Sequence, residues 1–312
     1  MTDTVKILAM HEGMPTLFPS KPDSWEFMDV SSGVETVIAD RGGEVEILLS
    51  ASIEKLDKAM LDKFPNLKMI ASVSAGFSNV DLEECRQRGI AVTNAPGLNS
   101  GDVADVAVSM MTSLLLNFPQ SQNYIMTDQW VTKDGPIRHS LKTSTVGIVG
   151  LGAIGKEAVT RLKPFGVELC WWGPRDKQDV DIPFIASIKE LAKKCRGLIV
   201  CCRPDDSTFH LIDDEIIKLL GQDGVIVNVS RGNVVDENAL IEALKTGKLG
   251  GAGLDVFDPE PTNSNRWEGV PNVILTPHQG GATYQSLFAS AGLAQQNIQN
   301  FLSGAPLVTS VL

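Results

Sequence analysis

The feature that most constrains this chain is the run IVGLGAIG, residues 148–155, in which three glycines follow an apolar segment. The residues before the glycines have strand composition and those after them have helix composition, so the glycines fall at a strand-to-helix junction. There, Gly150 permits a tight turn, Gly152 lets a pyrophosphate approach the backbone, and Gly155 lets the helix pack on the strand. The helix N-terminus adds unpaired N–H groups for the phosphates. The sequence therefore predicts a dinucleotide site rather than an ordinary turn.

The rest of the chain surrounds this junction with the same alternation of elements. Short β-rich runs alternate with amphipathic helical stretches, which is typical of parallel sheets joined by right-handed crossovers. The expected strands are residues 5–10, 45–50, 67–73, 90–95, 144–150, 167–172, 197–202, 224–230, 250–256 and 272–277. Helices are expected over 53–64, 100–118 and 283–304, and Pro119 is expected to end the second of them. These patterns predict an α/β protein with doubly wound parallel sheets.

Composition narrows the classes of partner. The net charge of −11 over 312 residues argues against nucleic acid or an anionic membrane as a partner, since both are polyanions. Apolar runs fall short of the roughly 18 to 20 residues that span a bilayer, and the N-terminus lacks the basic start of a signal peptide. The five cysteines and four histidines have no metal-ligand spacing. A cytoplasmic protein without a metal is expected.

The tip of the strand after the glycine helix distinguishes between two cofactors. An acidic side chain there would bind the ribose hydroxyls of NAD, whereas an arginine would accept the 2′-phosphate of NADP. The tip reads Trp172, Gly173, Pro174, Arg175 before the first acid, Asp176, which favours NADP(H) over NAD(H). The alternative is that Arg175 is a solvated loop charge. Arg203, in CCRPDDST, is either a second phosphate contact or a loop residue.

Three later residues fit the reduction of a 2-keto acid by hydride. That chemistry needs a group that holds the carboxylate, one that polarises the carbonyl and one that protonates the developing alkoxide. Arg231 follows a strand in VNVSRGNVV and could serve the first two needs, although a lone arginine is by default a surface ion pair. His278, at a strand end in ILTPHQGGAT, suits the third, and Glu260, in GLDVFDPEP, suits a carboxylate partner that fixes its tautomer.

Taken in order, GLGAIG, VNVSRGNVVDENAL, GAGLDVFDPEP and VILTPHQGGAT resemble the D-isomer-specific 2-hydroxyacid dehydrogenase family, over essentially the whole chain. Within the family the sequence is most similar to NADP-dependent glyoxylate/hydroxypyruvate and hydroxyphenylpyruvate reductases. The resemblance implies Arg231 for substrate, His278 as acid/base and Glu260 as its partner. It implies a substrate-carboxylate nest at Ser74, Ala75, Gly76 and Phe77, which the small residues there also fit. The cofactor contacts it implies, with the tip, are Gly150, Gly152, Ala153, Ile154, Gly155, Trp172, Gly173, Pro174, Arg175, Cys202, Arg203, Val229, Ser230, Arg231, Asp255, His278, Gly280 and Gly281.

The resemblance also implies a discontinuous architecture and a homodimer. Residues 1–98 and 285–312 would form a flavodoxin-like substrate-binding domain, and residues 99–284 an inserted Rossmann cofactor domain. The dimer would use the long helix from Val103 to Phe118 and its neighbours. The apolar side chains of this helix include Val106, Val108, Met110, Met111, Leu114 and Leu115. The alternative is that much of this surface packs within the chain. Where the family has a P-L-T-P-like loop this chain reads RPDDS (203–207), and RHSLKTST (138–145) lacks the family's usual glycine.

Two other functions stay open at this point. One is a nicotinamide-sensing binding protein, like the corepressors that share this fold. The other is a family member that uses NAD on another acid. The physiological keto acid depends on loops such as MHEGMPTL (10–17), where His11 is either a substrate contact or a loop histidine without a role.

Overall fold

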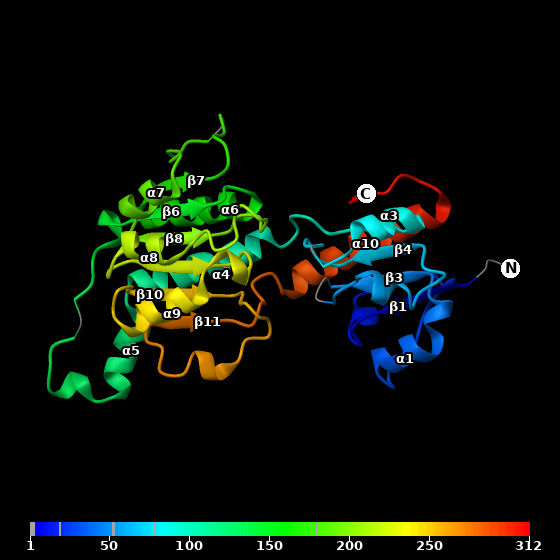
Figure 1. Ribbon diagram of the computed structural model, residues 1–312, viewed down its shortest axis with the longest axis horizontal. Coiled ribbons are helices and arrows are strands. Elements are labelled where there is room, and N and C mark those ends of the chain that lie inside the picture. Colours follow the sequence, from blue (N-terminus) through cyan, green and yellow to red (C-terminus); the bar gives the residue numbers. More distant parts are fainter. Residues whose placement is uncertain (1–3, 19, 52–53, 78, 136, 179) are drawn as a thin grey trace. The chain divides into compact units, whose positions relative to one another are not determined.

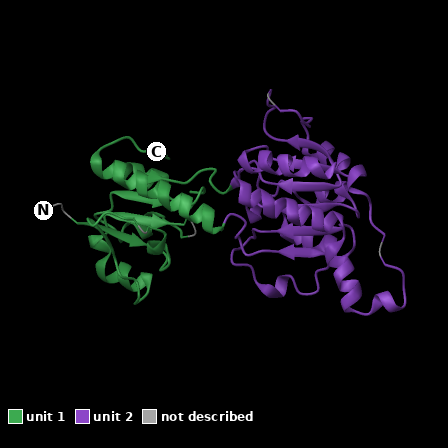
Figure 2. Cartoon of the chain, turned by 180° about the vertical axis from the view of Figure 1, so that it is seen from behind, with its two compact units in different colours: residues 1–99, 282–312 green, residues 100–281 purple. Residues whose placement is uncertain are grey.

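The computed structural model describes residues 4–18, 20–51, 54–77, 79–135, 137–178 and 180–312, and the chain divides into two compact units. Unit 1 comprises residues 1–99 and 282–312, and unit 2 comprises residues 100–281 (Figure 2). Each unit contains one parallel sheet, so the predicted α/β fold class is confirmed. The first domain boundary expected from the sequence lies one residue from the observed one, and the second lies three residues from it. The roles of the two domains stay predictions.

Unit 1 has a flavodoxin-like sheet. Its strands among the described residues are β1 (Val5–Ala9), β2 (Trp25–Phe27), β3 (Ile47–Ser50), β4 (Met69–Ser72) and β5 (Ala91–Thr93). Its helices there are α1 (Val34–Arg41), α2 (Lys58–Leu61), α3 (Leu82–Arg88) and α10 (Tyr284–Ser303). The strand order β2-β1-β3-β4-β5 is parallel throughout and is that of flavodoxin-like sheets. Ser50 at the end of β3 is paired in register with Ser72 at the end of β4.

Alternate strand residues of unit 1 are buried on opposite faces, as expected for a sheet covered on both sides. Leu8, Leu48 and Ile70 pack with side chains of α1, α2 and α3. Ile47 and Met69, which point the other way, pack with α10. The last helix of the chain therefore completes the core of the first unit.

Unit 2 has a larger sheet. Its strands among the described residues are β6 (Thr145–Val149), β7 (Glu168–Trp172), β8 (Gly197–Val200), β9 (Val225–Asn228), β10 (Gly251–Leu254) and β11 (Val273–Leu275). Its helices there are α4 (Ser100–Leu115), α5 (Phe118–Met126), α6 (Ala153–Leu162), α7 (Ile188–Lys194), α8 (Asp214–Leu220) and α9 (Glu237–Lys245). The strands lie in the order β11-β10-β9-β8-β6-β7, and a parallel bridge between Trp171 and Phe184 adds a short neighbour beyond β7. Counted with that bridge, the order contains the 3-2-1-4-5-6 arrangement of a Rossmann sheet.

Two layers of helices cover this sheet. α4 and α6 pack on one face with Val146, Ile148 and Val227, and α7, α8 and α9 pack on the other (Figure 1). The apolar side chains of α4 that were expected at a dimer interface, Val108, Met110, Met111, Leu114 and Leu115, are buried in this core, and Val106 packs against it. The core of unit 2 therefore accounts for the hydrophobicity of α4, and a partner is not needed to explain it.

Two helix predictions were wrong in detail, for local reasons. Residue 53 lies outside the described residues, and residues 54–64 do not form one helix. Leu56 makes a β-bridge with Val80, and the side chain of Asp57 caps a short α2 by accepting a hydrogen bond from the Met60 N–H. The long helix ends at Leu115, before the expected position. Pro119 lies in the first turn of the next helix, α5, where proline is tolerated because that N–H has no intrahelical partner.

Helices of the described residues are too short or too polar to cross a bilayer.

Candidate active site

The glycine turn of unit 2 joins β6 to α6, as predicted. Gly150 has φ of +96°, and a Cβ atom there would lie 2.4 Å from the Cα of Cys202 at the end of the neighbouring strand β8. A Cβ on Gly155 would lie 2.4 Å from the carbonyl oxygen of Gly150. These two glycines are therefore required by the turn and by the contact between helix and strand.

Gly152 differs from its two neighbours. It precedes α6 with an ordinary extended conformation, and a methyl group there would meet no described atom within 4 Å. The space beside its backbone is open, and α6 has neither a side-chain cap nor an acid in its first turn. An open N-terminus of this kind suits an anion such as a pyrophosphate. The residues at this turn therefore fit a dinucleotide.

The glycine turn lies where the sheet changes winding direction. β6 lies between β7 and β8, so the two connections diverge at this point, and open α/β sheets bind ligands at such a switch point. The Cys201 thiol, at the end of β8, donates to the carbonyl oxygen of Gly150 over 3.0 Å. Burial raises the pKa of Cys201, so the thiol keeps its proton and acts as a donor. Sequence analysis had singled out Cys202 and missed Cys201.

The tip of β7 carries the residues expected to select the cofactor. Pro174, Arg175 and Asp176 are exposed, and Arg175 forms no ion pair with any residue of the described ranges. Lys177, which sequence analysis missed, reaches back to the glycine turn, where its Nζ donates to the carbonyl oxygen of Leu151 over 2.5 Å. A second basic residue two positions after Arg175 was the signal available in the sequence. The tip therefore places a cation directly beside the glycine turn.

The predicted acid/base pair is formed. Nδ1 of His278 lies 2.6 Å from Oε2 of Glu260, and Oε1 of Glu260 accepts a hydrogen bond of 2.8 Å from the Phe257 N–H. Burial alone would raise the pKa of Glu260, but the hydrogen bonds from His278 and Phe257, with the charges of His278 and Arg231, lower it below its ordinary value. An ionised Glu260 requires a hydrogen on Nδ1, which leaves Nε2 of His278 to exchange a proton with a substrate.

The loop around His278 is held by Asp255, a residue predicted to contact the cofactor. Its buried carboxylate accepts hydrogen bonds from the Thr276 hydroxyl at 2.6 Å, the Gln279 N–H at 3.0 Å and the Gly280 N–H at 2.9 Å. These bonds lie on both sides of His278, whose φ of +51° is uncommon for a residue with a side chain. The structure therefore uses Asp255 to fix the backbone that carries the histidine.

The loop around Glu260 is fixed from α9 by a residue that sequence analysis missed. Buried Glu237 accepts a hydrogen bond of 2.6 Å from the Asp258 N–H, and its second oxygen lies 3.1 Å from Nη1 of Arg266. Burial raises the pKa of Glu237, and the Asp258 N–H and Arg266 oppose that effect. An acid on the buried side of the amphipathic stretch DENAL was the available signal.

Arg231 follows β9 and joins the same region through its neighbour Gly232. A Cβ on Gly232 would lie 1.9 Å from the carbonyl carbon of Phe257, so only glycine lets this turn contact the Glu260 loop. The guanidinium of Arg231 donates to the Ser230 carbonyl oxygen over 2.7 Å and forms no ion pair within the described ranges. The default interpretation of Arg231 as a surface ion pair therefore has no support, and the guanidinium is left for an anion.

The predicted carboxylate nest lies in unit 1, directly after β4. The Ala95 N–H donates to the Ser74 carbonyl oxygen over 2.8 Å. The side-chain amide of Asn94 donates to the Ala75 carbonyl oxygen over 2.7 Å. Among the described residues, the N–H groups of Ala75 and Phe77 have no hydrogen-bond acceptor. The carbonyls of this turn are fixed while two amides stay available, as a carboxylate site requires.

The other predicted cofactor positions lie around the same turn of unit 2. Ala153 and Ile154 are in the first turn of α6, Val229 and Ser230 are buried beyond β9, and Arg203 is exposed. Trp172 and Gly281 are half-buried, and Gly173 packs against the Trp171 ring. Whether these residues contact a cofactor stays a prediction. Within the described ranges, groups of three or more His, Cys, Asp or Glu side chains are not placed to hold a metal.

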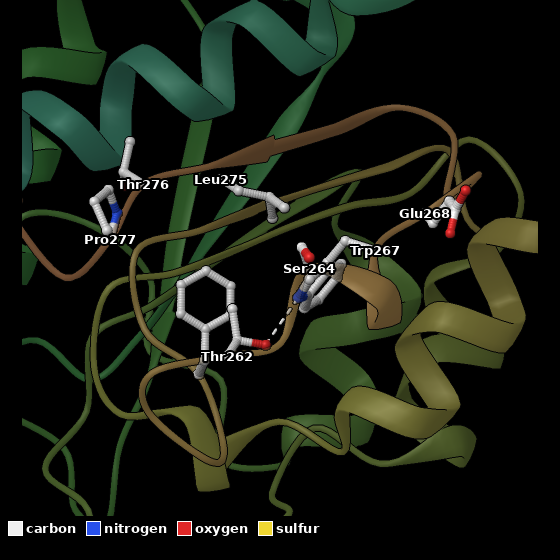
Figure 3. A pocket seen from close by; sticks show the side chains of 8 residues that line it. Thr262, Ser264, Trp267, Glu268, Leu275, Thr276 and Pro277 are labelled. Carbon is white, nitrogen blue, oxygen red and sulfur yellow. Dashed lines mark hydrogen bonds between the residues drawn. The ribbon is translucent and has the colours of Figure 1, made fainter.

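A shallow pocket of about 420 Å³ adjoins the Glu260 loop (Figure 3). Trp267 and Leu275 line it, and Nε1 of Trp267 donates to the Thr262 hydroxyl over 3.0 Å. Neither Glu260 nor His278 is among its described lining residues. We therefore assign the chemistry to the His278–Glu260 pair rather than to this pocket.

Comparison with known proteins gives one consistent family. The profile described as D-isomer specific 2-hydroxyacid dehydrogenase, NAD binding domain, matches residues 108–280. The chain is 34% identical to a glyoxylate/hydroxypyruvate reductase of Arabidopsis thaliana over 95% of this chain and 97% of that protein. It is 35% identical to a hydroxyphenylpyruvate reductase of Plectranthus scutellarioides over 82% of each. A structure of an NADPH-dependent glyoxylate/hydroxypyruvate reductase from Sinorhizobium meliloti with NADP and malonate superposes with a TM-score of 0.84 at 29% identity, covering 99% of this chain and 97% of that one.

Proposed function

The chain belongs to the D-isomer-specific 2-hydroxyacid dehydrogenase family of NAD(P)-dependent oxidoreductases, and we propose that it reduces 2-keto acids of the glyoxylate/hydroxypyruvate type with NADPH. The observation that carries this proposal is the His278–Glu260 pair at 2.6 Å, with an uncommitted Arg231 in the same unit. The names of the relatives from Arabidopsis thaliana and Sinorhizobium meliloti support this substrate class.

Each residue is assigned one role in the reduction. Arg231 binds the substrate carboxylate, and its guanidinium also polarises the carbonyl. The amides of Ala75 and Phe77 stay a predicted carboxylate site of unit 1. The bound dihydronicotinamide supplies the hydride. Nε2 of His278 gives its proton to the carbonyl oxygen as the carbon accepts hydride, so the keto group gains two electrons and two hydrogens. Glu260 stabilises the imidazolium before the transfer and holds the tautomer.

The same proposal names NADP(H) as the preferred cofactor. The tip of β7 presents Arg175 and Lys177, and the Lys177 ammonium lies at the carbonyl oxygen of Leu151 in the glycine turn. Asp176, the nearest acid, accepts a hydrogen bond of 2.7 Å from the Lys177 N–H. Two cations around one acid favour a 2′-phosphate over a free ribose hydroxyl.

Assays of glyoxylate, hydroxypyruvate and pyruvate with NADPH and with NADH test this function. We expect oxidation of NADPH with the first two substrates and a lower kcat/KM with NADH. Binding of NADPH without turnover of any 2-keto acid would support a nicotinamide-sensing protein instead. Turnover with NADH alone would support a family member with the other cofactor.

A homodimer is part of the proposal, and we assign its interface to the segment that directly follows α4. Six apolar side chains in and after α5 are largely exposed in the single chain: Phe118, Ile125, Met126, Trp130, Val131 and Ile137. Exposed apolar groups clustered in one segment are typical of an interface, and we assign it to a second copy on the basis of the family resemblance. Sedimentation of the wild type should give a dimer at micromolar concentration. Trp130→Lys should shift it towards monomer, and a monomeric wild type would contradict the assignment.

A further inference from the structure

Unit 1 contains a second histidine–carboxylate pair, which the proposed reaction does not use. Nε2 of His11 lies 2.7 Å from Oε1 of Glu54. The Glu54 side chain is only 14% exposed, whereas the imidazole is 45% exposed. An exposed ion pair contributes about 0–1 kcal/mol to stability, so stability gives little reason for this arrangement. The pair fixes one edge of an imidazole and leaves its other edge open.

The pair lies at the edge of the sheet where open parallel α/β sheets bind ligands. His11 follows β1, and Glu54 follows β3, the central neighbour of β1 and β4. Oε2 of Glu54 accepts a hydrogen bond of 2.8 Å from the hydroxyl of Ser50, the last residue of β3. Glu54 therefore ties the imidazole to the carboxyl end of the middle strand.

The same edge leads from Ser50 to the carboxylate nest. Ser50 is paired in register with Ser72, both are buried, and the hydroxyl of Ser72 lies 3.0 Å from that of Ser74 in the nest. β1 and β4 are two strand spacings apart, about 10 Å. A histidine side chain and a three-carbon keto acid together cover that distance. His11 is therefore within reach of the third carbon of a keto acid whose carboxylate lies at the nest.

The chemistry of the imidazole specifies which substituent it recognises. Nε2 lies 2.7 Å from a carboxylate oxygen as a close ion-pair contact without aligned hydrogen-bond geometry. So short an approach is repulsive between two acceptors, so the nitrogen carries a hydrogen. Nδ1, for which the described residues supply no hydrogen-bond partner, is then an acceptor in the neutral ring and a donor in the charged one. A hydroxyl group fits both states, whereas a methyl group fits neither.

We propose that the His11–Glu54 pair recognises the C3 hydroxyl of the substrate and selects hydroxypyruvate over pyruvate. This inference rests on the proposed function. It assigns His11 as a specificity-determining residue and Glu54 as the positioning residue that orients it. A neutral hydrogen bond that is partly exposed to water gives a discrimination of about tenfold.

The test is the ratio of kcat/KM for hydroxypyruvate to that for pyruvate, since these substrates differ only by the hydroxyl. We expect His11→Ala and His11→Phe to lower the ratio about tenfold. His11→Gln, which keeps a hydrogen-bonding side chain, should retain more of the ratio than His11→Ala. Glu54→Gln should lower it less than His11→Ala, because the imidazole remains but is oriented less firmly.

Lys58→Ala is the matched control. It also removes an ion pair in unit 1, to Glu84, whose side chain is 14% exposed like that of Glu54. A ratio that stays within twofold in His11→Ala, or that falls equally in Lys58→Ala, would overturn the inference while leaving the proposed reductase intact. A wild type that reduces neither substrate would overturn both. Thermal unfolding midpoints of all variants separate loss of recognition from loss of fold.

Discussion

The Glu260–His278 region and the tip of β7, both in unit 2, are constructed in opposite ways. Each loop of the acid/base pair is braced by a buried carboxylate: Asp255 holds the backbone around His278, and Glu237 holds the backbone before Glu260. The tip of β7 has exposed side chains, and a hydrogen bond from the long side chain of Lys177 connects it to the glycine turn.

The difference follows from what each region has to do. Proton transfer requires a donor within hydrogen-bond reach of one oxygen, so a small displacement of the imidazole is costly. Recognition of a phosphate by flexible cations tolerates more movement, because three oxygens accept from several directions. The braced loops are therefore assigned to the proposed proton transfer, and the exposed cationic side chains are assigned to the proposed cofactor choice.

The largest effect should come from the braced region. We expect His278→Ala to lower kcat by about two to four orders of magnitude, the usual contribution of a positioned acid. The Kd of NADPH should change little, because the imidazole is assigned to the substrate. Stopped-flow turnover and fluorescence titration measure the two quantities, and near-normal turnover in the variant would remove His278 from the mechanism.

The next largest effect is expected on cofactor affinity when Gly152 of the glycine turn is substituted. Gly152→Ala should fold normally, because its conformation is ordinary and the added methyl meets no described atom within 4 Å. If a pyrophosphate lies there, the methyl displaces it at a cost of about 1–3 kcal/mol, which weakens NADPH and NADH equally by roughly 5- to 150-fold. Gly292→Ala, another methyl into open space, is the control. Unchanged affinity in Gly152→Ala would move the pyrophosphate elsewhere.

The preference for NADPH over NADH should change only when residues at the tip of β7 are substituted. A charged hydrogen bond to phosphate contributes roughly 1.5 to 3 kcal/mol, so Arg175→Ala or Lys177→Ala should reduce the preference for NADPH by about 10- to 100-fold. Lys189→Ala, which removes a cation paired with Glu215, should leave it unchanged. The measurement is kcat/KM with each cofactor. A parent that prefers NADH, or a preference untouched in both tip variants, would contradict the assignment.

The smallest effect concerns pH and stability. The pKa of Glu260 is below its ordinary 4.5 in the folded protein, so its ionised form stabilises the fold above the unfolded-state pKa. That stabilisation is lost as the pH falls through the lower folded pKa. The difference in denaturation midpoint between wild type and Glu260→Gln should therefore be present at about pH 5 and shrink below about pH 4.5. A difference that grows on acidification would show the opposite shift.

Sequence patterns predicted the parts of this molecule that depend on periodicity and on local backbone requirements. The glycine turn falls where strand and helix composition meet, and both Glu260 and His278 were assigned from motif and strand-end position. Lys177 was missed, and Asp255 was assigned to the cofactor rather than to the loop of His278. The position of each depends on a backbone group that is distant in the sequence. The helix expected over 53–64 was wrong because Leu56 pairs with Val80, a tertiary contact that overrides its helical pattern.

The placement of α10 sets an order for biosynthesis. Residues 100–281 are contiguous and contain every strand and helix of unit 2, so that unit holds its full complement of core residues once it has left the ribosome. The strands of unit 1 emerge earlier, yet one apolar face, including Ile47 and Met69, waits for residues 282–312. The later-encoded unit thus has the means to fold first, while the earlier one carries an uncovered sheet face until residues 282–312 have been synthesised.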